Sequence, residues 1–186
     1  MTIEIVGIGG SMDPGSQSER ALRAVLAACA TRGASTSAFT GRSLEMPPYV
    51  PGATVPTAAL APVEAIRRSA AVVIASPGYH GTVSGLVKNA LDYAEDLRTD
   101  VRPYFSGRAV GCIATAGGWP GAINTLGALR DIVHALRGWP TPLGAAINSA
   151  ENAFDEAGRC LVPRVGQVLD LMAEEVMGFA RSAAPR

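Results

Sequence analysis

The sequence has no excess of either charge and almost no lysine. Sixteen acidic residues balance sixteen basic ones, and Lys88 is the one lysine among the basic residues. Proteins that bind nucleic acid through its phosphates carry a basic patch or stripe, and no block of that kind occurs in this sequence. The charge pattern therefore argues against nucleic acid as a partner.

Long hydrophobic runs are also missing. No stretch approaches the ~18 to 20 consecutive apolar residues that a membrane-spanning helix needs. The N-terminus leads directly into an apolar segment, without the basic region that begins a secretory signal. We therefore expect a soluble, cytoplasmic protein with no membrane partner.

Cysteine and histidine are scarce and scattered. Cys29, Cys112 and Cys160 lie far apart and form no C-x-x-C motif, and there are only two histidines. A buried free thiol behaves as a small apolar group, so we interpret the cysteines as structural. With no close group of His, Cys, Asp and Glu, the sequence gives no support for a metal site.

What the sequence does contain is enough apolar material for one core. The 186 residues are 48% hydrophobic, which fits a single domain over residues 1–186. Short β-branched runs alternate with stretches of helical periodicity, in which Leu60, Val63 and Ile66 are expected to face the core. Strands are predicted at 3–8, 35–40, 70–75, 109–114 and 144–148, with helices at about 18–32, 57–69, from 86, from 122 and beyond 160. This alternation predicts an α/β fold with a doubly wound, five-stranded parallel sheet.

A loop rich in Gly, Pro and Ser follows the first strand. Residues 9–18 read Gly-Gly-Ser-Met-Asp-Pro-Gly-Ser-Gln-Ser and lead into a helix. A helix N-terminus offers unpaired N–H groups and a partial positive charge to an anion, and the serine hydroxyls add donors. The loop is therefore a candidate phosphate site. Ser16 and Glu19 also fit a capping box, in which case the serines serve only to begin the helix.

The most specific stretch follows the third strand. It reads Ser-Pro-Gly-Tyr-His-Gly-Thr-Val-Ser-Gly-Leu-Val-Lys-Asn-Ala-Leu-Asp-Tyr over residues 76–93. Pro77 and Gly78 are expected to end the strand in a turn, and the apolar residues from Leu86 recur at helical spacing. A strand, an exposed loop and a helix in this order place the loop where open α/β sheets bind ligands.

This stretch resembles the second signature of the NADPH-dependent FMN reductase family. The loop at 9–18 resembles the first motif of that family, roughly Gly-Ser-x-Arg-x-x-Ser-x-Asn/Ser/Thr, with Gly10, Ser11, Ser16 and Ser18 in register. The resemblance implies a flavodoxin-like sheet of order 2-1-3-4-5, FMN as cofactor and NAD(P)H as reductant. The FMN-binding residues that it implies are Ser11, Ser16, Gln17 and Ser18 near the phosphate, and Pro77, Gly78, Tyr79 and His80 near the flavin ring.

Two positions depart from the family pattern. Asp13 stands where the first motif usually has Arg, and a carboxylate beside a phosphate is unfavourable unless it turns outward. Arg20, in the first helical turn, is our hypothesis for the compensating positive charge. Gly78 stands where many relatives carry Glu, so any contact of that carboxylate is lost. Lys88 and Asp92 fit an ordinary surface pair at i and i+4, with a role between subunits as the alternative.

A third Gly-rich loop follows the fourth strand. Gly117 and Gly118 let the backbone come close to a ligand, and the order of strands brings them beside the proposed flavin ring. We therefore add Gly117, Gly118 and Trp119 to the candidate FMN-binding residues. Trp119 either shields the flavin or packs at a dimer contact, and His80 either meets the flavin or is a solvent-exposed loop residue.

These features favour an NAD(P)H-dependent FMN reductase, or an FMN-containing oxidoreductase. It would pass a hydride from NAD(P)H through the flavin to free flavin, a quinone, an azo compound or another small-molecule electron acceptor. No acid, base or nucleophile is nominated, because the cofactor carries the chemistry. The alternatives are an FMN-binding electron-transfer protein without NAD(P)H activity and a flavodoxin-like scaffold with weakened FMN binding. The resemblance also implies a homodimer or homotetramer.

Overall fold

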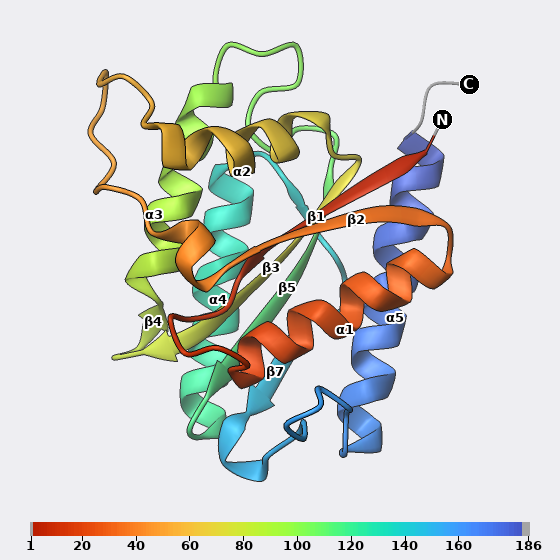
Figure 1. The fold of residues 1–186 in the computed structure, drawn as a ribbon. Coiled ribbons are helices and arrows are strands. Elements are labelled where there is room, and N and C mark those ends of the chain that lie inside the picture. Colours follow the sequence, from red (N-terminus) through yellow and green to blue (C-terminus); the bar gives the residue numbers. More distant parts are fainter. Residues whose placement is uncertain (1, 184–186) are drawn as a thin grey trace.

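A parallel sheet runs through the centre of the molecule (Figure 1). The computed structural model describes residues 2–183. The strands are β1 (Ile3–Gly9), β2 (Ala34–Thr40), β3 (Ala71–Tyr79), β4 (Thr82–Val83), β5 (Ala109–Ala116), β6 (Trp139–Pro140) and β7 (Ala145–Asn148). The helices are α1 (Gln17–Thr31), α2 (Thr57–Arg68), α3 (Gly85–Asp92), α4 (Trp119–Ala135) and α5 (Pro163–Ala183), with 3-10 turns at Gly41–Leu44, Tyr93–Leu97 and Ser149–Glu151. The predicted alternation of strands and helices is confirmed.

The strand order is β2-β1-β3-β5, with β6 and β7 both pairing with the far side of β5. β6 pairs with the start of β5 at Ala109, and β7 pairs with its end from Ile113 onward. Pro142 lies between the two short strands and has no N–H to donate to a ladder. Counted as one interrupted edge strand, β6 and β7 complete the predicted order 2-1-3-4-5, in which the fourth strand is β5 and the fifth is β7.

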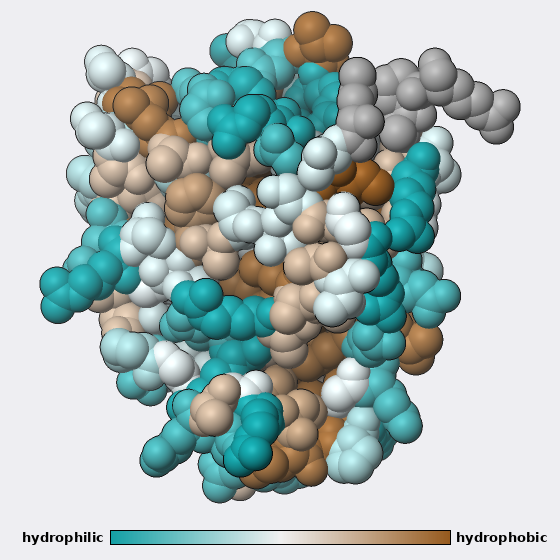
Figure 2. Space-filling view, turned by 45° about the vertical axis from the view of Figure 1, so that its right-hand side comes forward, coloured by the Kyte–Doolittle hydropathy of each residue, from teal (hydrophilic) through white to brown (hydrophobic). Residues whose placement is uncertain are grey.

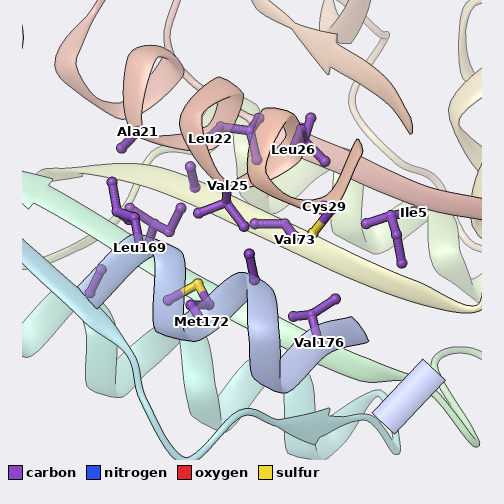
Figure 3. Packing of buried hydrophobic residues seen from close by; sticks show 14 of the residues in the cluster. Ile5, Ala21, Leu22, Val25, Leu26, Cys29, Val73, Leu169, Met172 and Val176 are labelled. Atoms are coloured by element: carbon purple, nitrogen blue, oxygen red, sulfur yellow. The ribbon is translucent and has the colours of Figure 1, made fainter. Parts of the chain in front are cut away.

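Helices cover both faces of the sheet, as expected for a doubly wound fold (Figure 1). α1 and α5 lie on one face, where Figure 3 shows Val25 and Cys29 of α1 on the same side of the sheet as Met172 and Val176 of α5. α2, α3 and α4 cover the other face, with a second buried apolar cluster between them and the sheet. Each fully buried aliphatic side chain of this size contributes roughly 1.5–3 kcal/mol of transfer free energy. Two cores of this kind hold the sheet in place.

The amphipathic prediction for α2 was right in outline and wrong at one residue. Val63 and Ile66 are buried, but Leu60 is 46% exposed, and Ala59 is the buried residue of that turn. α2 is one of three helices sharing a face of the sheet, so it buries only a narrow stripe of side chains. The spacing of apolar residues therefore predicts the helix correctly but does not predict which residues lie at the border of its buried face.

β3 extends further than the sequence predicts. The turn expected at Pro77 and Gly78 is absent from that position: both residues belong to β3, which continues to Tyr79. Pro77 pairs with Thr115 of β5 near the end of the ladder, where the missing N–H of proline leaves no central hydrogen bond unmade. The chain instead reverses at His80 and Gly81, whose φ angles of 51° and 95° suit a two-residue hairpin turn.

The surface mixes hydrophilic and apolar side chains, as Figure 2 shows for one face. Within residues 2–183, no helix is both long enough and apolar enough to cross a bilayer.

Candidate functional site

Three loops meet at one edge of the sheet, because they follow the carboxyl ends of neighbouring parallel strands. The register places Gly9 at the end of β1 beside Ala75 of β3, and Pro77 of β3 beside Thr115 of β5. The Gly10 amide donates a hydrogen bond to the Ala75 carbonyl at 3.0 Å, which ties the first loop to β3. The residues that follow β1, β3 and β5 are therefore neighbours in space, as the sequence predicted.

The first loop turns tightly before α1. Ser11 is 6% exposed, and its Oγ accepts a hydrogen bond from the Asp13 amide at 3.1 Å. Ser16 is the N-cap of α1, with its Oγ accepting from the Glu19 amide at 3.3 Å and lying 3.1 Å from Ser18 Oγ. The amides of Gln17 and Ser18 are in the first helical turn and have no acceptor inside the helix. The Gln17 amide is the more open of the two to an anion, because Ser18 is fully buried.

The capping box predicted for Ser16 and Glu19 is half formed. Glu19 does not reach back to the loop: its carboxylate accepts from Arg23 Nη2 at 2.7 Å and from Thr40 Oγ1 at 3.1 Å. The Glu19 side chain therefore ties α1 to the end of β2. Ser16 caps the helix, as the capping interpretation expects. Its hydroxyl also lies beside that of Ser18 in the loop proposed to bind an anion, so both interpretations of Ser16 stay open.

The side chain of Gln17 is used elsewhere. Its amide forms two hydrogen bonds to the backbone of Phe154, in the connection between β7 and α5. Only the backbone N–H of Gln17 remains for a ligand at the first loop. Nothing in the local sequence pattern signals this contact, because 137 positions separate the two residues.

Asp13 and Arg20 lie on the outer side of the same loop. Asp13 is exposed, whereas the Arg20 guanidinium packs against Gly15: a Cβ added at Gly15 would lie 3.1 Å from Arg20 Nη2. None of the ion pairs within residues 2–183 involves Arg20. A cation in the first turn of a helix is unfavourable by itself, so an anion at this loop would relieve its position.

The β3–β4 hairpin forms the second loop. Pro77 is buried, and Gly78 lies so close to α4 that a Cβ there would collide with Thr125. Tyr79 is 52% exposed, and His80 at the tip is exposed as well. The hairpin extends beyond the sheet in Figure 1, so both side chains are open to a ligand or a partner. His80 is therefore a solvent-exposed loop residue in this chain, which was one of the two interpretations of it.

The third loop is shorter than expected. Gly117 and Gly118 form it alone, because α4 begins at Trp119, which sequence analysis placed in the loop. A Cβ on Gly117 would meet no atom within 4 Å, so its backbone faces open space. Trp119 is 42% exposed in the first turn of α4. The backbone of Gly117 is therefore exposed at the same end of the sheet as the β3–β4 hairpin.

Two residues of the second signature, Asn89 and Tyr93, hold the loop after β2. Asn89 Nδ2 donates to the carbonyls of Met46 and Pro47, and its Oδ1 accepts from the Tyr49 amide at 2.8 Å. Tyr93 Oη donates to Pro47 O at 2.9 Å. This segment forms one wall of an open cleft of about 640 Å³, which Met12 of the first loop also lines. Sequence reasoning missed these roles, because the acceptors are backbone groups without a residue signature.

Ser84, Lys88 and Asp92 have simple structural roles at α3, and the pairing of Lys88 with Asp92 is one of the two interpretations considered above. Ser84 caps the helix, accepting from the Val87 amide at 3.2 Å. Lys88 Nζ and Asp92 Oδ1 form an exposed ion pair at 2.6 Å along the helix, a pair of the surface type. That geometry matches the i, i+4 interpretation of Lys88 and Asp92.

The buried thiols are poor nucleophiles. Burial raises the pKa of Cys29 to about 11 and that of Cys112 to about 12, so both remain protonated at neutral pH. Cys160 is exposed and lies outside the three loops. Within residues 2–183, no group of three or more His, Cys, Asp or Glu is placed to hold a metal ion.

Comparisons with known proteins bear on the family and the fold. A family model described as NADPH-dependent FMN reductase matches residues 3–152. An FMN-dependent NADPH-azoreductase of Staphylococcus aureus is 37% identical over 87 residues, which are 47% of this chain and 43% of the relative. The matched region is therefore less than half the length of that relative.

Solved structures share the fold over nearly the whole chain. The flavoenzyme FerB of Paracoccus denitrificans, an NAD(P)H:acceptor oxidoreductase, superposes with a TM-score of 0.78 at 19% identity, covering 97% of this chain and 98% of its own. An oxidoreductase of Corynebacterium diphtheriae gives a TM-score of 0.73 at 21% identity, with the same coverage. At these identities the likeness establishes the flavodoxin-like fold.

Proposed function

Because the chain belongs to the NADPH-dependent FMN reductase family, we propose that it is an FMN-dependent oxidoreductase that uses NAD(P)H to reduce a small-molecule acceptor. FMN, when bound, supplies the two-electron chemistry that connects the reductant and the acceptor. The observation that carries the proposal is the meeting of three loops at the carboxyl edge of β1, β3 and β5, which is the ligand-binding edge of an open α/β sheet.

The residues present fit FMN. At the first loop, the amides of the first turn of α1 and the Ser16 hydroxyl offer donors to a phosphate, whereas Ser18 is fully buried and its hydroxyl lies 3.1 Å from that of Ser16. Ser11 shapes the loop by holding the Asp13 amide. The chain thus presents an anion-binding turn at β1, with the two neighbouring loops available for the flavin ring.

The ring would lie between the second and third loops. Gly78 is half-buried beside the buried Pro77, Tyr79 and His80 are open at the hairpin, and Gly117 leaves its backbone exposed. Trp119 stands at the start of α4 beside them. These residues bind and orient the ring, and the amides of those other than Pro77 can donate to its polar edge. No side chain among them is assigned as a catalytic acid, base or nucleophile.

An azo compound, a quinone or free flavin is the acceptor class that we propose. The azoreductase named above supports an azo acceptor for its relatives. The β3–β4 hairpin and the open space over Gly117 leave room for a second ligand at the same edge, as a reaction with two successive substrates requires. We further propose that residues 1–186 act as one domain, in the cytoplasm, as a homodimer or homotetramer; light scattering of the purified protein measures the last of these.

The test is anaerobic absorption spectroscopy. The purified chain is mixed with FMN, freed of unbound flavin and then treated with NADPH, with NADH in a parallel sample. The proposal expects flavin to be retained and its visible absorption to bleach on adding the reductant. Retained flavin that stays oxidised would instead support the electron-transfer alternative. Absence of retained flavin, together with no steady-state NADPH oxidation in excess FMN, would support the scaffold with weakened FMN binding.

A further inference from the structure

A groove of about 380 Å³ runs along the outer edge of β7. Residues 144–147 form its floor, and β7 pairs only with β5 among the strands of residues 2–183. Its walls come from both layers of helices: Trp119 and Ile123 on α4, and Val165 and Val168 on α5. None of the roles proposed above uses this groove, apart from the position of Trp119.

The lining of the groove is mostly apolar. Ile123 is 59% exposed and Trp119 is 42% exposed, although both are large hydrophobic side chains on helices that bury their other faces. The volume lies within the range of small-molecule sites, and a flat apolar ligand between the indole and the valines would remove this surface from water. The chemistry of the walls therefore favours an aromatic or otherwise planar apolar molecule.

One end of the groove is positively charged. Arg164 lines it, is exposed and is the second residue of α5, where the helix N-terminus adds partial positive charge. None of the ion pairs within residues 2–183 involves Arg164, and no acidic residue lines the groove. An acid group on the ligand would find its counter-charge there.

Trp119 connects the groove with the proposed flavin site. It directly follows Gly117 and Gly118 in the chain and begins α4, so its indole lines the groove while its backbone joins the third loop. A ligand in the groove would therefore lie next to the loop that faces the flavin ring. This continuity argues for a substrate subsite and against an unrelated surface hollow.

We propose that this groove binds planar apolar molecules that carry an acid group, and that it is the subsite for the electron acceptor. The acceptor role rests on the function proposed above, whereas binding to the groove does not. The two parts are therefore tested separately, first without flavin or NADPH and then with them.

The binding test uses 8-anilinonaphthalene-1-sulfonate, a planar aromatic sulfonate. The chain has two tryptophans, and W139F leaves Trp119 as the sole reporter; Trp139 lies in β6, beside Phe179. We expect saturable binding that quenches Trp119 emission. R164E and I123E should each weaken binding by about tenfold, in line with the loss of one charge-assisted contact or of the apolar wall. R68E, an exposed charge reversal before β3 at the opposite edge of the sheet, should leave binding unchanged.

The flavin site is separated from the groove by competition. Saturating FMN should leave the probe bound in the groove, as measured by equilibrium dialysis, because a flavin beside Trp119 would itself quench the indole. Displacement by FMN, or equal binding by wild type, R164E and I123E, would overturn the proposal. Absence of probe binding to protein whose circular dichroism is intact would overturn it too, including the case in which a second copy of the chain covers the groove. Failure of FMN retention, together with no NADPH oxidation in excess FMN, would overturn only the proposed function if the probe is still bound.

The acceptor role has its own measurement. With flavin and NADPH present, R164E should raise the KM for a carboxylated azobenzene about tenfold and leave the KM for an uncharged dimethylaminoazobenzene within twofold. An equal change in the KM for both acceptors would overturn the role of Arg164 in binding the acid group. An unchanged KM for the carboxylated acceptor, with probe binding weakened, would show that the groove does not serve the acceptor.

Discussion

The side-chain amide of Gln17 pairs with the backbone of Phe154 in both directions. Nε2 donates to the Phe154 carbonyl at 3.2 Å, and the Phe154 amide donates to Oε1 at 3.1 Å. The Gln17 side chain thus forms the pair of hydrogen bonds that a neighbouring strand residue would form with Phe154. It connects the segment between β7 and α5 to the first turn of α1. The same turn carries the amides proposed to bind phosphate, so the stability of this connection and the affinity for FMN are linked.

Replacing Gln17 by alanine should loosen the connection. Two hydrogen bonds are lost, worth about 0.5–1.5 kcal/mol each, so amide exchange in residues 149–162 should accelerate by roughly tenfold while exchange in β1 and β3 stays slow. FMN affinity should fall by a factor of a few. Q17E is the matched control, since it keeps the acceptor and removes the donor; exchange as slow as in wild type in Q17A would contradict the inferred link.

Arg20 should select for the phosphate of FMN. Its guanidinium packs on Gly15 of the first loop, and a charge-assisted hydrogen bond is worth about 1.5–3 kcal/mol. R20A should therefore weaken FMN binding by roughly 10- to 100-fold and leave riboflavin binding unchanged, with R20K intermediate. D13N should strengthen FMN binding, because it removes a negative charge near the phosphate. Fluorescence titration with both flavins checks this, and equal losses for FMN and riboflavin in R20A would show a merely structural role.

The sequence predicted the layout of the site better than its details. Apolar runs and helical periodicity identify β1, β3, β5 and the helices after them, because these patterns lie within each segment of the sequence. The contacts of Asn89 and Gln17 with distant backbone could not be predicted, since backbone acceptors leave no mark in sequence. Pro77 was expected to end β3, but its place near the end of the ladder with β5 makes its missing N–H harmless.

Gly78 should tolerate no side chain while Thr125 is present. A Cβ at Gly78 would collide with Thr125 Oγ1 and lie 3.3 Å from Thr125 Cβ. G78A should therefore destabilise the protein by about 1–3 kcal/mol, the usual cost of overpacking. T125A removes the hydroxyl and should recover most of that loss in the double variant. Urea denaturation of the four proteins of this cycle gives the coupling energy; strictly additive effects would contradict the predicted collision.

Arg108 should be more important for stability than its charge implies. It is 1% exposed, and its guanidinium donates to the carbonyls of Arg67, Ser69 and Tyr104 at 2.8–3.2 Å. These bonds close the C-terminal end of α2, and desolvation lowers the pKa of Arg108 to about 10. R108M keeps the aliphatic stem but strands the carbonyls, so unfolding should become easier by roughly 2–4 kcal/mol. R137M is the control, because Arg137 does not donate to these carbonyls. A loss of stability in R108M no larger than that in R137M would refute this role of Arg108.

The buried thiols should make the protein less stable in mild alkali. Burial raises the pKa of Cys29 to about 11 and of Cys112 to about 12, above the ordinary value of 9.0 that these thiols regain on unfolding. Below pH 9 both states hold the proton and the free energy of unfolding is unaffected. As the pH rises from 9 towards 11, the unfolded chain loses protons that the folded chain keeps, so each thiol lowers the free energy of unfolding by up to about 1.4 kcal/mol per pH unit.

Urea denaturation at pH 8, 9 and 10 under reducing conditions measures the slope. C112A should make the decline shallower, whereas C160A, at an exposed thiol, should leave it unchanged; an identical slope in wild type and C112A would mean that Cys112 ionises as freely in the folded protein as in the unfolded chain.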